Sequence, residues 1–454
     1  LLPSISVETE SADKEYRLSA KSTALEYAGE HIGGALWQYF EGQGDAERAL
    51  AAMKDASRYT RGHLSRDAVR ALYGGAVTLS ASRMDMARSC HFAYFMRYGL
   101  KARERTGAGF DAPQIGTFVH DVMEHTLRQA KECGGLHTLS KDKLHALVRA
   151  SIEEYIDRVL PDLSEKSARF RYLFNRLCAT VERIMDEMSE ELQSSDFEPL
   201  AFELEFGADG QLPAITIREE NGTARVVGKV DRVDGWLHDG KLYLRVVDYK
   251  TGKKSFDLAE LRYGLGLQML LYLFTLKEEG QMLFGRHEIV PAGVLYTPAR
   301  EPMLRCARDT EPETIEKALK KELRRSGMVL EDPVVLQAME HSALESPCYL
   351  PIAVKRDGAV TGSLASAEQL GKLSKYVDHI LHEITQEVFA GNIDADPYAR
   401  TPQQSACTYC EFASACHFEN GCGSDRMEYI KATKNDEFWQ YIDEVNGEGA
   451  HENG

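Results

Sequence analysis

Residues 228–236, GKVDRVDGW, and residues 242–250, LYLRVVDYK, decide the fold. Both runs contain residues that favour β-strands, Val and Trp in the first and Val and Tyr in the second, and Asp239-Gly240 between them is typical of a two-residue hairpin turn. Each run also carries acidic residues within apolar sequence, where an unpaired carboxylate is costly. We therefore predict two antiparallel strands that bring buried carboxylates together.

Further strands are expected on both sides of this hairpin. Residues 200–206 alternate apolar and polar side chains, and Asn221-Gly222 predicts a second hairpin. A helix from about Asp257 to Lys277 followed by an apolar strand predicts a return crossover. The expected strands span residues 200–206, 215–218, 224–236, 242–249 and 289–296. Together they predict an α/β fold in which an antiparallel meander becomes part of a mixed sheet flanked by helices.

Amphipathic patterns predict long helices ahead of these strands. Apolar residues recur at helical spacing from Pro113 to about Lys131, and this helix carries His120. A helix start at Ser80 is expected to continue through Cys90. Further helices are expected over residues 141–160 and 166–193. Residues 300–395 are expected to be mostly helical with a loop-rich interval around residues 345–362, and the acidic C-terminal tail is expected to be frayed.

Composition excludes some classes of protein. The 454 residues are 43% hydrophobic and 28% charged, and no run approaches the roughly 18 apolar residues that span a bilayer. Nine Cys, an odd number, favour reduced thiols and a metal site over a disulfide framework, so we expect a cytoplasmic protein. The chain opens Leu1-Leu2-Pro3-Ser4, without Met or a signal peptide, and is therefore expected to be a piece of a longer polypeptide.

The net charge of −17 disfavours nucleic-acid binding by bulk electrostatics. An enzyme that collects carboxylates around a divalent cation can nevertheless be acidic overall and present basic strips, such as Lys250 to Lys254 and Lys317 to Arg325. Each strip taken alone is more simply a solvated surface.

Asp248 and Lys250 lie two apart on a predicted strand and so project to the same face. A carboxylate that holds Mg²⁺ or Mn²⁺ beside an ammonium that orients or deprotonates water is suited to phosphodiester hydrolysis. Asp231 on the neighbouring strand would add a second carboxylate, and His120 could complete the set. An isolated Asp-x-Lys pair is usually a weak surface ion pair, but two Val precede Asp248 on a strand that we expect to be buried.

These motifs resemble the PD-(D/E)xK nuclease superfamily in its RecB-like branch, which implies a restriction-endonuclease-like sheet with large helical additions. The resemblance covers about residues 78–425. It implies that His120, Asp231 and Asp248 bind the metal and that Lys250 is the catalytic lysine. Glu203 matches an upstream acidic position of the family, for which Glu205 is a rival. Gln268 and Tyr272 match the family's Q-x-x-x-Y motif, expected to support the site and line the DNA path.

Near the C-terminus, Cys407, Cys410 and Cys416 have C-x2-C-x5-C spacing, which supplies three thiolates but no obvious fourth. Candidates for the fourth ligand are His417, Cys422 and the distant Cys90, and a local zinc site that uses Cys422 is plausible from spacing alone.

The iron-sulfur branch of the family offers another interpretation of these cysteines. The pattern resembles the AddB-type subunits of bacterial AddAB helicase-nucleases and, similarly, Dna2. In these proteins one Cys before the nuclease core and three after it bind a [4Fe-4S] cluster, which implies ligation by Cys90, Cys407, Cys410 and Cys416. His91 stands where that family has Pro. Such a cluster would act as a staple between segments more than 300 residues apart.

The resemblance also implies a function and a partner. It implies a metal-dependent DNA exonuclease that cuts single strands as a helicase-nuclease processes double-strand breaks for recombinational repair. Residues 251–255 faintly resemble the end of a P-loop, but Val247 stands where that motif needs its first Gly, so a motor would come from a partner subunit of AddA type or from sequence outside this chain. Residues 1–77 would be a linker or the tail of a helicase-like domain, residues 78–425 the nuclease domain and residues 426–454 an acidic tail. The alternatives are a DNA-end-binding structural module with a vestigial nuclease and a stand-alone Cas4-like or Dna2-like exonuclease.

Overall fold

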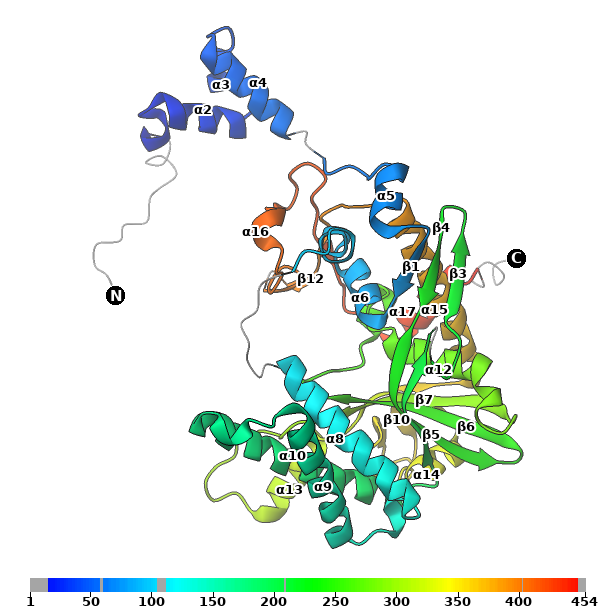
Figure 1. The fold of residues 1–454 in the computed structure, drawn as a ribbon. Helices are drawn as coiled ribbons and strands as arrows, with labels where there is room; N and C mark the ends of the chain where they lie inside the picture. The colour runs from blue at the N-terminus through cyan, green and yellow to red at the C-terminus, as the bar shows by residue number, and fades with distance from the viewer. Residues whose placement is uncertain (1–14, 58–59, 104–111, 208–209, 402, 448–454) are drawn as a thin grey trace. The chain divides into compact units, whose positions relative to one another are not determined.

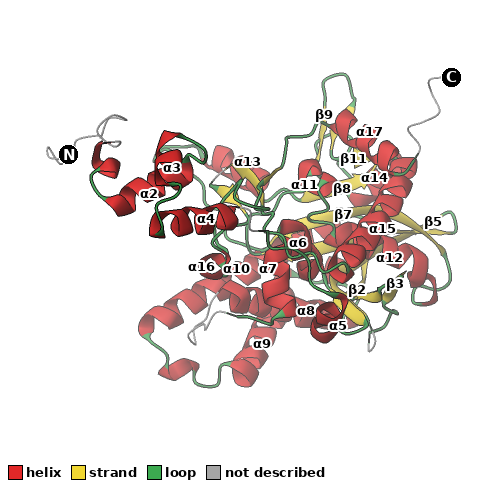
Figure 2. Ribbon diagram, turned by 90° about the horizontal axis from the view of Figure 1, so that it is seen from above, coloured by secondary structure: helices red, strands yellow, loops and turns green. Residues whose placement is uncertain are grey.

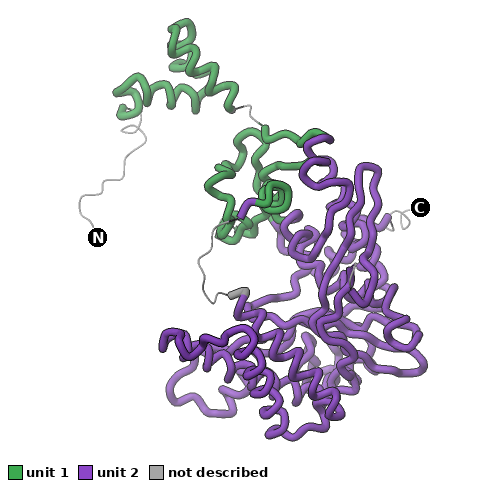
Figure 3. Tube along the Cα trace, in the orientation of Figure 1, with its two compact units in different colours: residues 1–65, 89–101, 391–429 green, residues 66–88, 102–390, 430–454 purple. Residues whose placement is uncertain are grey.

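The structure is a computed structural model that describes residues 15–57, 60–103, 112–207, 210–401 and 403–447. The chain forms two compact units (Figure 3). Unit 1 combines residues 1–65, 89–101 and 391–429, and unit 2 contains residues 66–88, 102–390 and 430–454. The boundaries expected after residues 77 and 425 stay predictions. No helix in the described part of the chain is long and apolar enough to cross a membrane.

A six-stranded mixed sheet forms the centre of unit 2 (Figures 1 and 2), which confirms the predicted fold class. Its order is β11-β8-β7-β6-β5-β2. The strands span Glu198–Phe206 (β2), Gly228–His238 (β5), Lys241–Lys250 (β6), Glu288–Pro298 (β7), Ser326–Leu330 (β8) and Leu364–Ala365 (β11).

The decisive hairpin forms as the sequence predicts. β5 and β6 pair antiparallel, and Asp239 and Gly240 both have positive φ, 49° and 78°, as the hairpin turn requires. β6 and β7 pair parallel, which confirms the crossover. The helical part of this crossover is not one helix, however. It consists of α11 (Leu258–Arg262) and α12 (Gln268–Glu279), because the chain turns at Gly264 and Gly266 with φ of 74° and 68°.

The predicted strand over residues 224–236 is also divided. Its first part, β4 (Gly222–Val226), pairs with β3 (Ile215–Glu219) and β1 (Ala76–Leu79) in a separate three-stranded sheet. Its second part is β5. The division falls at Val227, whose backbone N–H donates to the carbonyl of Leu79 instead of joining the main sheet.

Two further expectations near the C-terminal end are wrong. The segment expected to be mostly helical contributes β8 and β11 to the edge of the main sheet, besides α13 (Pro312–Glu322), α14 (Pro333–Met339), the β9–β10 pair (Ile352–Val354, Val360–Gly362) and α15 (Ala367–Phe389). Within the tail expected to be frayed, Asn435–Val445 forms α17, which packs against α11 and α15. Burial of Phe438 and Ile442, both 0% exposed, stabilises this helix.

The long helices ahead of the strands match their predictions. They are α8 (Ala112–Glu132), α9 (Lys141–Val159) and α10 (Ala168–Gln193), with the short α5 (Arg66–Tyr73) and α6 (Ala81–Ser89) earlier in the chain. Ser140 and Ser167 cap α9 and α10 by accepting backbone N–H bonds. α8 packs against α9 and β2, and this contact brings one face of α8 to the edge of the sheet.

A cluster of buried charges lies between α10 and the sheet. Arg232, Asp234 and Arg245 are 0% exposed, and Glu191 of α10 and Arg325 are 2% and 4% exposed. Arg232 Nη2 donates to Asp234 Oδ2 at 3.0 Å, and Arg245 Nε donates to the same oxygen at 2.9 Å. Burial raises the pKa of Glu191, but Arg325, Arg245 and Arg232 outweigh it and lower that pKa to about 2.

Unit 1 is built from distant parts of the chain. Helices α2 (Lys21–Glu30), α3 (Ala35–Phe40) and α4 (Asp45–Ser57) pack around Trp37, Phe40 and Leu50. The rest contains α7 (His91–Tyr94), the π-helical turn Phe95–Gly99, α16 (Ala413–Cys416) and the strands β12 (Tyr398–Thr401), β13 (Gln404–Ser405) and β14 (Glu428–Tyr429). The predicted helix through Cys90 is wrong, since Cys90 is extended, with φ of −175°, between α6 and α7.

Replacing Arg245 should unfold the protein at markedly lower denaturant, because Arg245→Met leaves Asp234 and Glu191 buried with fewer opposite charges. We expect a loss of about 3–5 kcal/mol in the free energy of unfolding, measured by urea denaturation. The control is Arg149→Met, whose ion pair with Glu182 is two-thirds exposed on the arginine side and should contribute less than about 1 kcal/mol. Equal losses in both variants would contradict this role for the buried cluster.

Candidate active site

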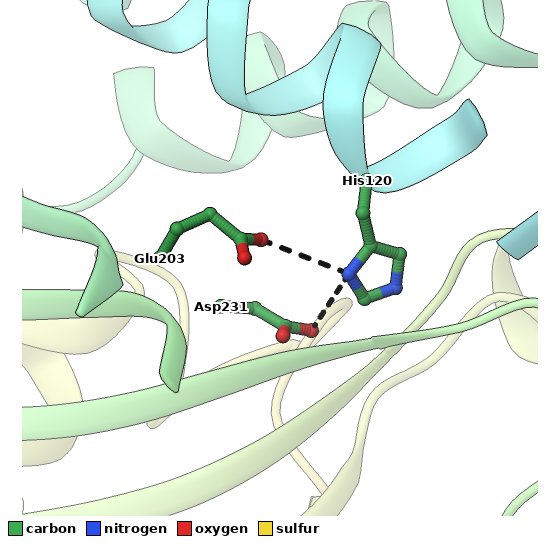
Figure 4. A group of neighbouring side chains, drawn as sticks. All are labelled: His120, Glu203 and Asp231. Carbon is green, nitrogen blue, oxygen red and sulfur yellow. Dashed lines mark ion pairs between the residues drawn. The ribbon is translucent and has the colours of Figure 1, made fainter. Parts of the chain in front are cut away.

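His120 is presented by α8, whose opposite side is anchored in the core. Phe118, Val119, Val122 and Met123 are all 0% exposed, so the rotation of this helix about its axis is fixed by packing. Figure 4 shows the imidazole of His120 pointing from α8 toward the carboxylates of Glu203 and Asp231 on the sheet. The predicted helical histidine is therefore brought to the predicted acidic strands.

The side chains of His120, Glu203 and Asp231 form a compact group. His120 Nδ1 lies 3.5 Å from Asp231 Oδ2 and 3.8 Å from Glu203 Oε1. One nitrogen and two carboxylate oxygens from these residues lie within 4.8 Å of one another, and no other set of three His, Cys, Asp or Glu side chains in the described residues does so. This spacing suits ligands that share one metal ion.

The backbone of Tyr249 fixes two members of this group. The β5–β6 ladder ends where Arg232 pairs with Val247, and two residues later the N–H of Tyr249 donates to Asp231 Oδ2 at 2.8 Å. The carbonyl of Tyr249 accepts from His120 Nε2 at 3.1 Å. Since a carbonyl only accepts, Nε2 carries a proton, and Nδ1 is the nitrogen that faces the carboxylates. A histidine that ligates a metal commonly has this arrangement.

Glu203 has an unusual backbone for a residue within a strand. Its φ is +48°, in the left-handed region, although it lies in β2 between Phe202 and Leu204, which pair with β5. Such a conformation costs a non-glycine residue on the order of 1–3 kcal/mol and is concentrated at functional sites. The Glu203 carboxylate is mostly buried and lies 2.7 Å from Lys229 Nζ. Its rival Glu205 is about half exposed and lies outside the compact group.

Asp248 and Lys250 lie beside this group. Lys250 Nζ is 2.7 Å from Asp248 Oδ2, and Asp248 is 4% exposed, which confirms the predicted buried strand. The geometry of this contact is that of an ion pair and not of a hydrogen bond. Asp248 Oδ2 is therefore buried without a hydrogen-bonding partner. Burial and the neighbouring Asp231 charge raise the pKa of Asp248 to about 6 against the opposing effect of Lys250.

The charges of the compact group perturb one another strongly. Burial lowers the pKa of His120, but hydrogen bonding and charge from Asp231 and Glu203 outweigh it and raise that pKa to about 10. For Glu203, burial raises the pKa, whereas His120 and Lys229 lower it further, so the net shift is downward. The two carboxylates of the compact group therefore favour a cation beside them.

Gln268 and Tyr272 lie together at the start of α12. Gln268 Nε2 donates to the Tyr272 hydroxyl at 3.2 Å, and both line a cavity of about 610 Å³ that Lys229 also lines. Gly228 lets the chain pass close to this wall, because an added Cβ would lie 2.5 Å from the rings of both Phe206 and Tyr272. The predicted pair thus lies in one cavity wall with Lys229, the neighbour of Glu203.

The predicted cluster cysteines all belong to unit 1. Cys90 is 8% exposed, and burial raises the pKa of its thiol to about 12. Burial, and to a lesser extent the charges of Cys410 and Cys416, raise the pKa of the Cys407 thiol, although the three sulfurs do not form a group within 4.8 Å of one another. Cys422, the candidate for a local zinc site, is exposed.

Arg61 joins the two segments that carry these cysteines. Its Nη2 donates to the carbonyl of Cys416 at 2.8 Å, and its guanidinium lies 4.6 Å from the ring centroid of Phe92. Asp425 pairs with it at 2.7 Å. Beside Cys90, both the backbone N–H and Nδ1 of His91 donate to Asp396, at 2.9 and 2.6 Å. His91, which stands where the iron-sulfur branch of the family has Pro, thus also ties the Cys90 segment to the C-terminal segment.

Similarity to known protein families identifies the superfamily. A family model of the PD-(D/E)XK nuclease superfamily matches residues 78–417, three quarters of the chain. The chain belongs to this superfamily. The match spans His120, both acidic strands and α12, so the superfamily assignment covers the whole compact group.

Similar proteins carry one name, the B-type subunit of an ATP-dependent helicase/deoxyribonuclease. The protein of this name from Ruminiclostridium cellulolyticum is 30% identical over 422 residues, which are 91% of this chain and 36% of that protein. The one from Acetivibrio thermocellus is 32% identical over 412 residues, 90% of this chain and 35% of that protein. The chain therefore spans about one third of the length of these curated relatives.

Sequence reasoning missed two residues at this site. Lys229 was not singled out, although it lies two residues before Asp231 and so on the same side of a strand. Tyr249 contributes through its backbone, and the sequence gives no signal for that. The left-handed backbone that brings Glu203 to His120 is equally invisible in the sequence.

Replacing the buried carboxyl of Asp248 should stabilise the metal-free protein at alkaline pH. Because its folded-state pKa lies above the unfolded value, its ionisation destabilises the fold as pH rises through about 6. With a chelator present, Asp248→Asn should gain on the order of 1–3 kcal/mol in unfolding free energy at pH 8. The gain should shrink toward pH 4, where the Asp248 carboxyl of the folded protein is protonated.

The control for this measurement is Asp157→Asn on the exposed side of α9, which should change stability little at either pH. Urea denaturation of the three proteins at pH 4 and pH 8 provides the comparison. An Asp248→Asn protein less stable than the wild type at pH 8 would contradict the assigned burial cost.

Proposed function

We propose that this chain is the nuclease module of a helicase-nuclease and that it hydrolyses phosphodiester bonds of single DNA strands as an exonuclease. The observation that carries the proposal is the compact group of His120, Glu203 and Asp231 beside the Asp248–Lys250 pair. Membership of the nuclease superfamily and the names of the relatives support the same activity.

The donor set fits a hard divalent cation, Mg²⁺ or Mn²⁺. Carboxylate oxygens dominate it, and the one imidazole turns Nδ1 toward them, the nitrogen that would bind the cation once its proton is displaced. We propose His120, Asp231 and Asp248 as the ligands, with Glu203 as a further ligand or as the group that holds the others in place. A bound cation supplies Lewis acidity toward the phosphate and lowers the pKa of a bound water.

Lys250 is the proposed catalytic lysine. Asp248 keeps its ammonium 2.7 Å away, on the same side of β6 and next to the compact group. There the ammonium can orient the attacking water or accept a proton from it once deprotonated, and in its charged form it offsets negative charge on the phosphate. Gln268, Tyr272 and Lys229 line the adjoining cavity, and we assign them to binding the DNA strand.

We further propose that Cys90, Cys407, Cys410 and Cys416 hold a [4Fe-4S] cluster. The contacts of Arg61 to Phe92 and Cys416 and the bonds from His91 to Asp396 support this ligand set, because they tie the Cys90 segment to the segment that carries the other three cysteines. Its role would be to fasten residues 89–101 of unit 1 to residues 391–429. In the cell we place the chain in the cytoplasm beside a partner motor subunit of AddA type, in the repair of double-strand breaks.

Cleavage of a single-stranded oligonucleotide with Mg²⁺ tests the proposed site. Asp248→Ala, Asp231→Ala and Glu203→Gln should each lower the cleavage rate more than about 100-fold, since even residues around a metal's ligands typically cost 10–100-fold. The matched control is Glu205→Gln, which removes the exposed rival two residues from Glu203 and should keep activity near that of the wild type. A wild type without activity, or undiminished cleavage by Asp248→Ala, would refute the assignment.

The cluster is tested separately, by the visible absorbance and thermal unfolding of anaerobically purified protein. Cys90→Ala should lose the iron-sulfur absorbance and unfold at a lower temperature, because the staple between the segments is lost. Cys422→Ala should retain both properties, since Cys422 is exposed and not among the proposed ligands. Loss of bound metal in Cys422→Ala but not in Cys90→Ala would instead identify a local site.

A further inference from the structure

An apolar pocket of about 340 Å³ lies within unit 2 beside the end of β6. Phe170, Leu173, Phe174 and Leu177 of α10 form one wall, and Thr251 and Ala299 belong to the other. The rings of Phe170 and Phe174 are nearly parallel, at 8°, with centroids 6.3 Å apart. Leu173 is 51% exposed, so the pocket is accessible from solvent. Its volume is near the lower end of small-ligand pockets, about 300–1,000 Å³.

The walls of this pocket are continuous with the proposed catalytic residues. Thr251 follows Lys250 directly, and the backbone N–H of Ala299 donates to the Lys250 carbonyl at 2.8 Å. On the other side, Phe174 packs against Phe118 of α8 with ring centroids 5.0 Å apart, so the aromatic wall is anchored in the core on the side of α8 opposite His120. The pocket therefore lies beside the backbone of Lys250, the proposed catalytic lysine.

Charged side chains surround the pocket. Arg176 and Arg300 line it and pair at 2.6 Å with Glu301 and Glu322, and Lys253, 83% exposed, lies 3.9 Å from Glu322. The charged side chains that line the pocket itself are Arg176, Arg300 and Glu301, two cations against one carboxylate around an apolar interior. This combination of an aromatic wall and a basic rim is what a nucleotide requires, a flat ring for the base and positive charge for its phosphate.

We propose that this pocket receives one unpaired base of the strand being cut, in the nucleotide next to the scissile phosphate. The inference rests on the proposed nuclease function and adds the feature that selects single strands. In a duplex each base is stacked and paired, so it reaches such a pocket only after unpairing. An unpaired base packs against the Phe170–Phe174 wall, while its phosphate lies at the arginine rim.

The test uses the intact protein and single-stranded oligonucleotides that carry one abasic site at successive positions. In the wild type, cleavage of one bond should fall about 10-fold when the abasic site reaches a single position beside it, in line with the effect of removing a stacked base. Thr180→Trp fills the pocket from α10 and should cut the unmodified strand about 10-fold more slowly, with no further loss at that abasic position.

The matched control is Ala179→Trp, which adds the same side chain to the neighbouring, exposed position of α10 and should behave as the wild type. Phe170→Ala removes the aromatic wall and should resemble Thr180→Trp, which keeps the test valid if the larger substitution disturbs folding. Equal cleavage at every abasic position, or equal rates for Thr180→Trp and Ala179→Trp, overturns the proposal.

Failure of the proposed function is distinguishable from failure of the pocket. If the wild type binds the oligonucleotides in EDTA but does not cut them with Mg²⁺, the nuclease proposal fails. The affinity for the oligonucleotides in EDTA, measured by fluorescence anisotropy, then tests whether the pocket binds a base. Binding about 10-fold weaker in Thr180→Trp than in Ala179→Trp supports a base-binding pocket, and equal affinities overturn it.

Discussion

The backbone of Tyr249 is the constraint on which the candidate site depends. Beyond the last β5–β6 pair its N–H and carbonyl are taken by Asp231 and His120, so two groups from separate elements are held at one point. The Tyr249 hydroxyl accepts from Arg232, which belongs to the buried charge cluster beneath α10. The metal-binding group and the interior ion pairs thus share one residue, and a shift of β6 would disturb both.

Several costs are concentrated around this point. Glu203 has a left-handed backbone, Asp248 is buried with a raised pKa, and Arg245 and Asp234 are charged at 0% exposure. Such costs persist only where the surrounding structure over-determines the conformation. Here the packed face of α8 and the crossover through α12 to β7 supply that constraint. The cost of gathering acidic groups is the expected consequence of preparing a site for a cation.

Much of the fold and of the candidate site could be predicted from the sequence, because the relevant signals are local. The Asp239-Gly240 turn, the apolar stripe of α8 and the alternation along β2 each depend on a few neighbouring residues. The division at Val227 could not be predicted, because a strand that leaves one sheet for another is decided by the Leu79 carbonyl, far away in the chain. Glu203 could be named but not chosen over Glu205, since only a backbone reversal within β2 brings it to His120.

The most direct measurement is anomalous X-ray diffraction from crystals soaked in Mn²⁺. We expect one strong anomalous peak within about 2.0–2.3 Å of His120 Nδ1 and of an Asp231 carboxylate oxygen, with Asp248 or Glu203 completing the contacts. The hydrogen bond from His120 Nε2 to the Tyr249 carbonyl should remain in place. A map without a peak at His120 and Asp231, or with Mn²⁺ bound only at exposed acidic side chains, would contradict a metal-dependent nuclease site at this position.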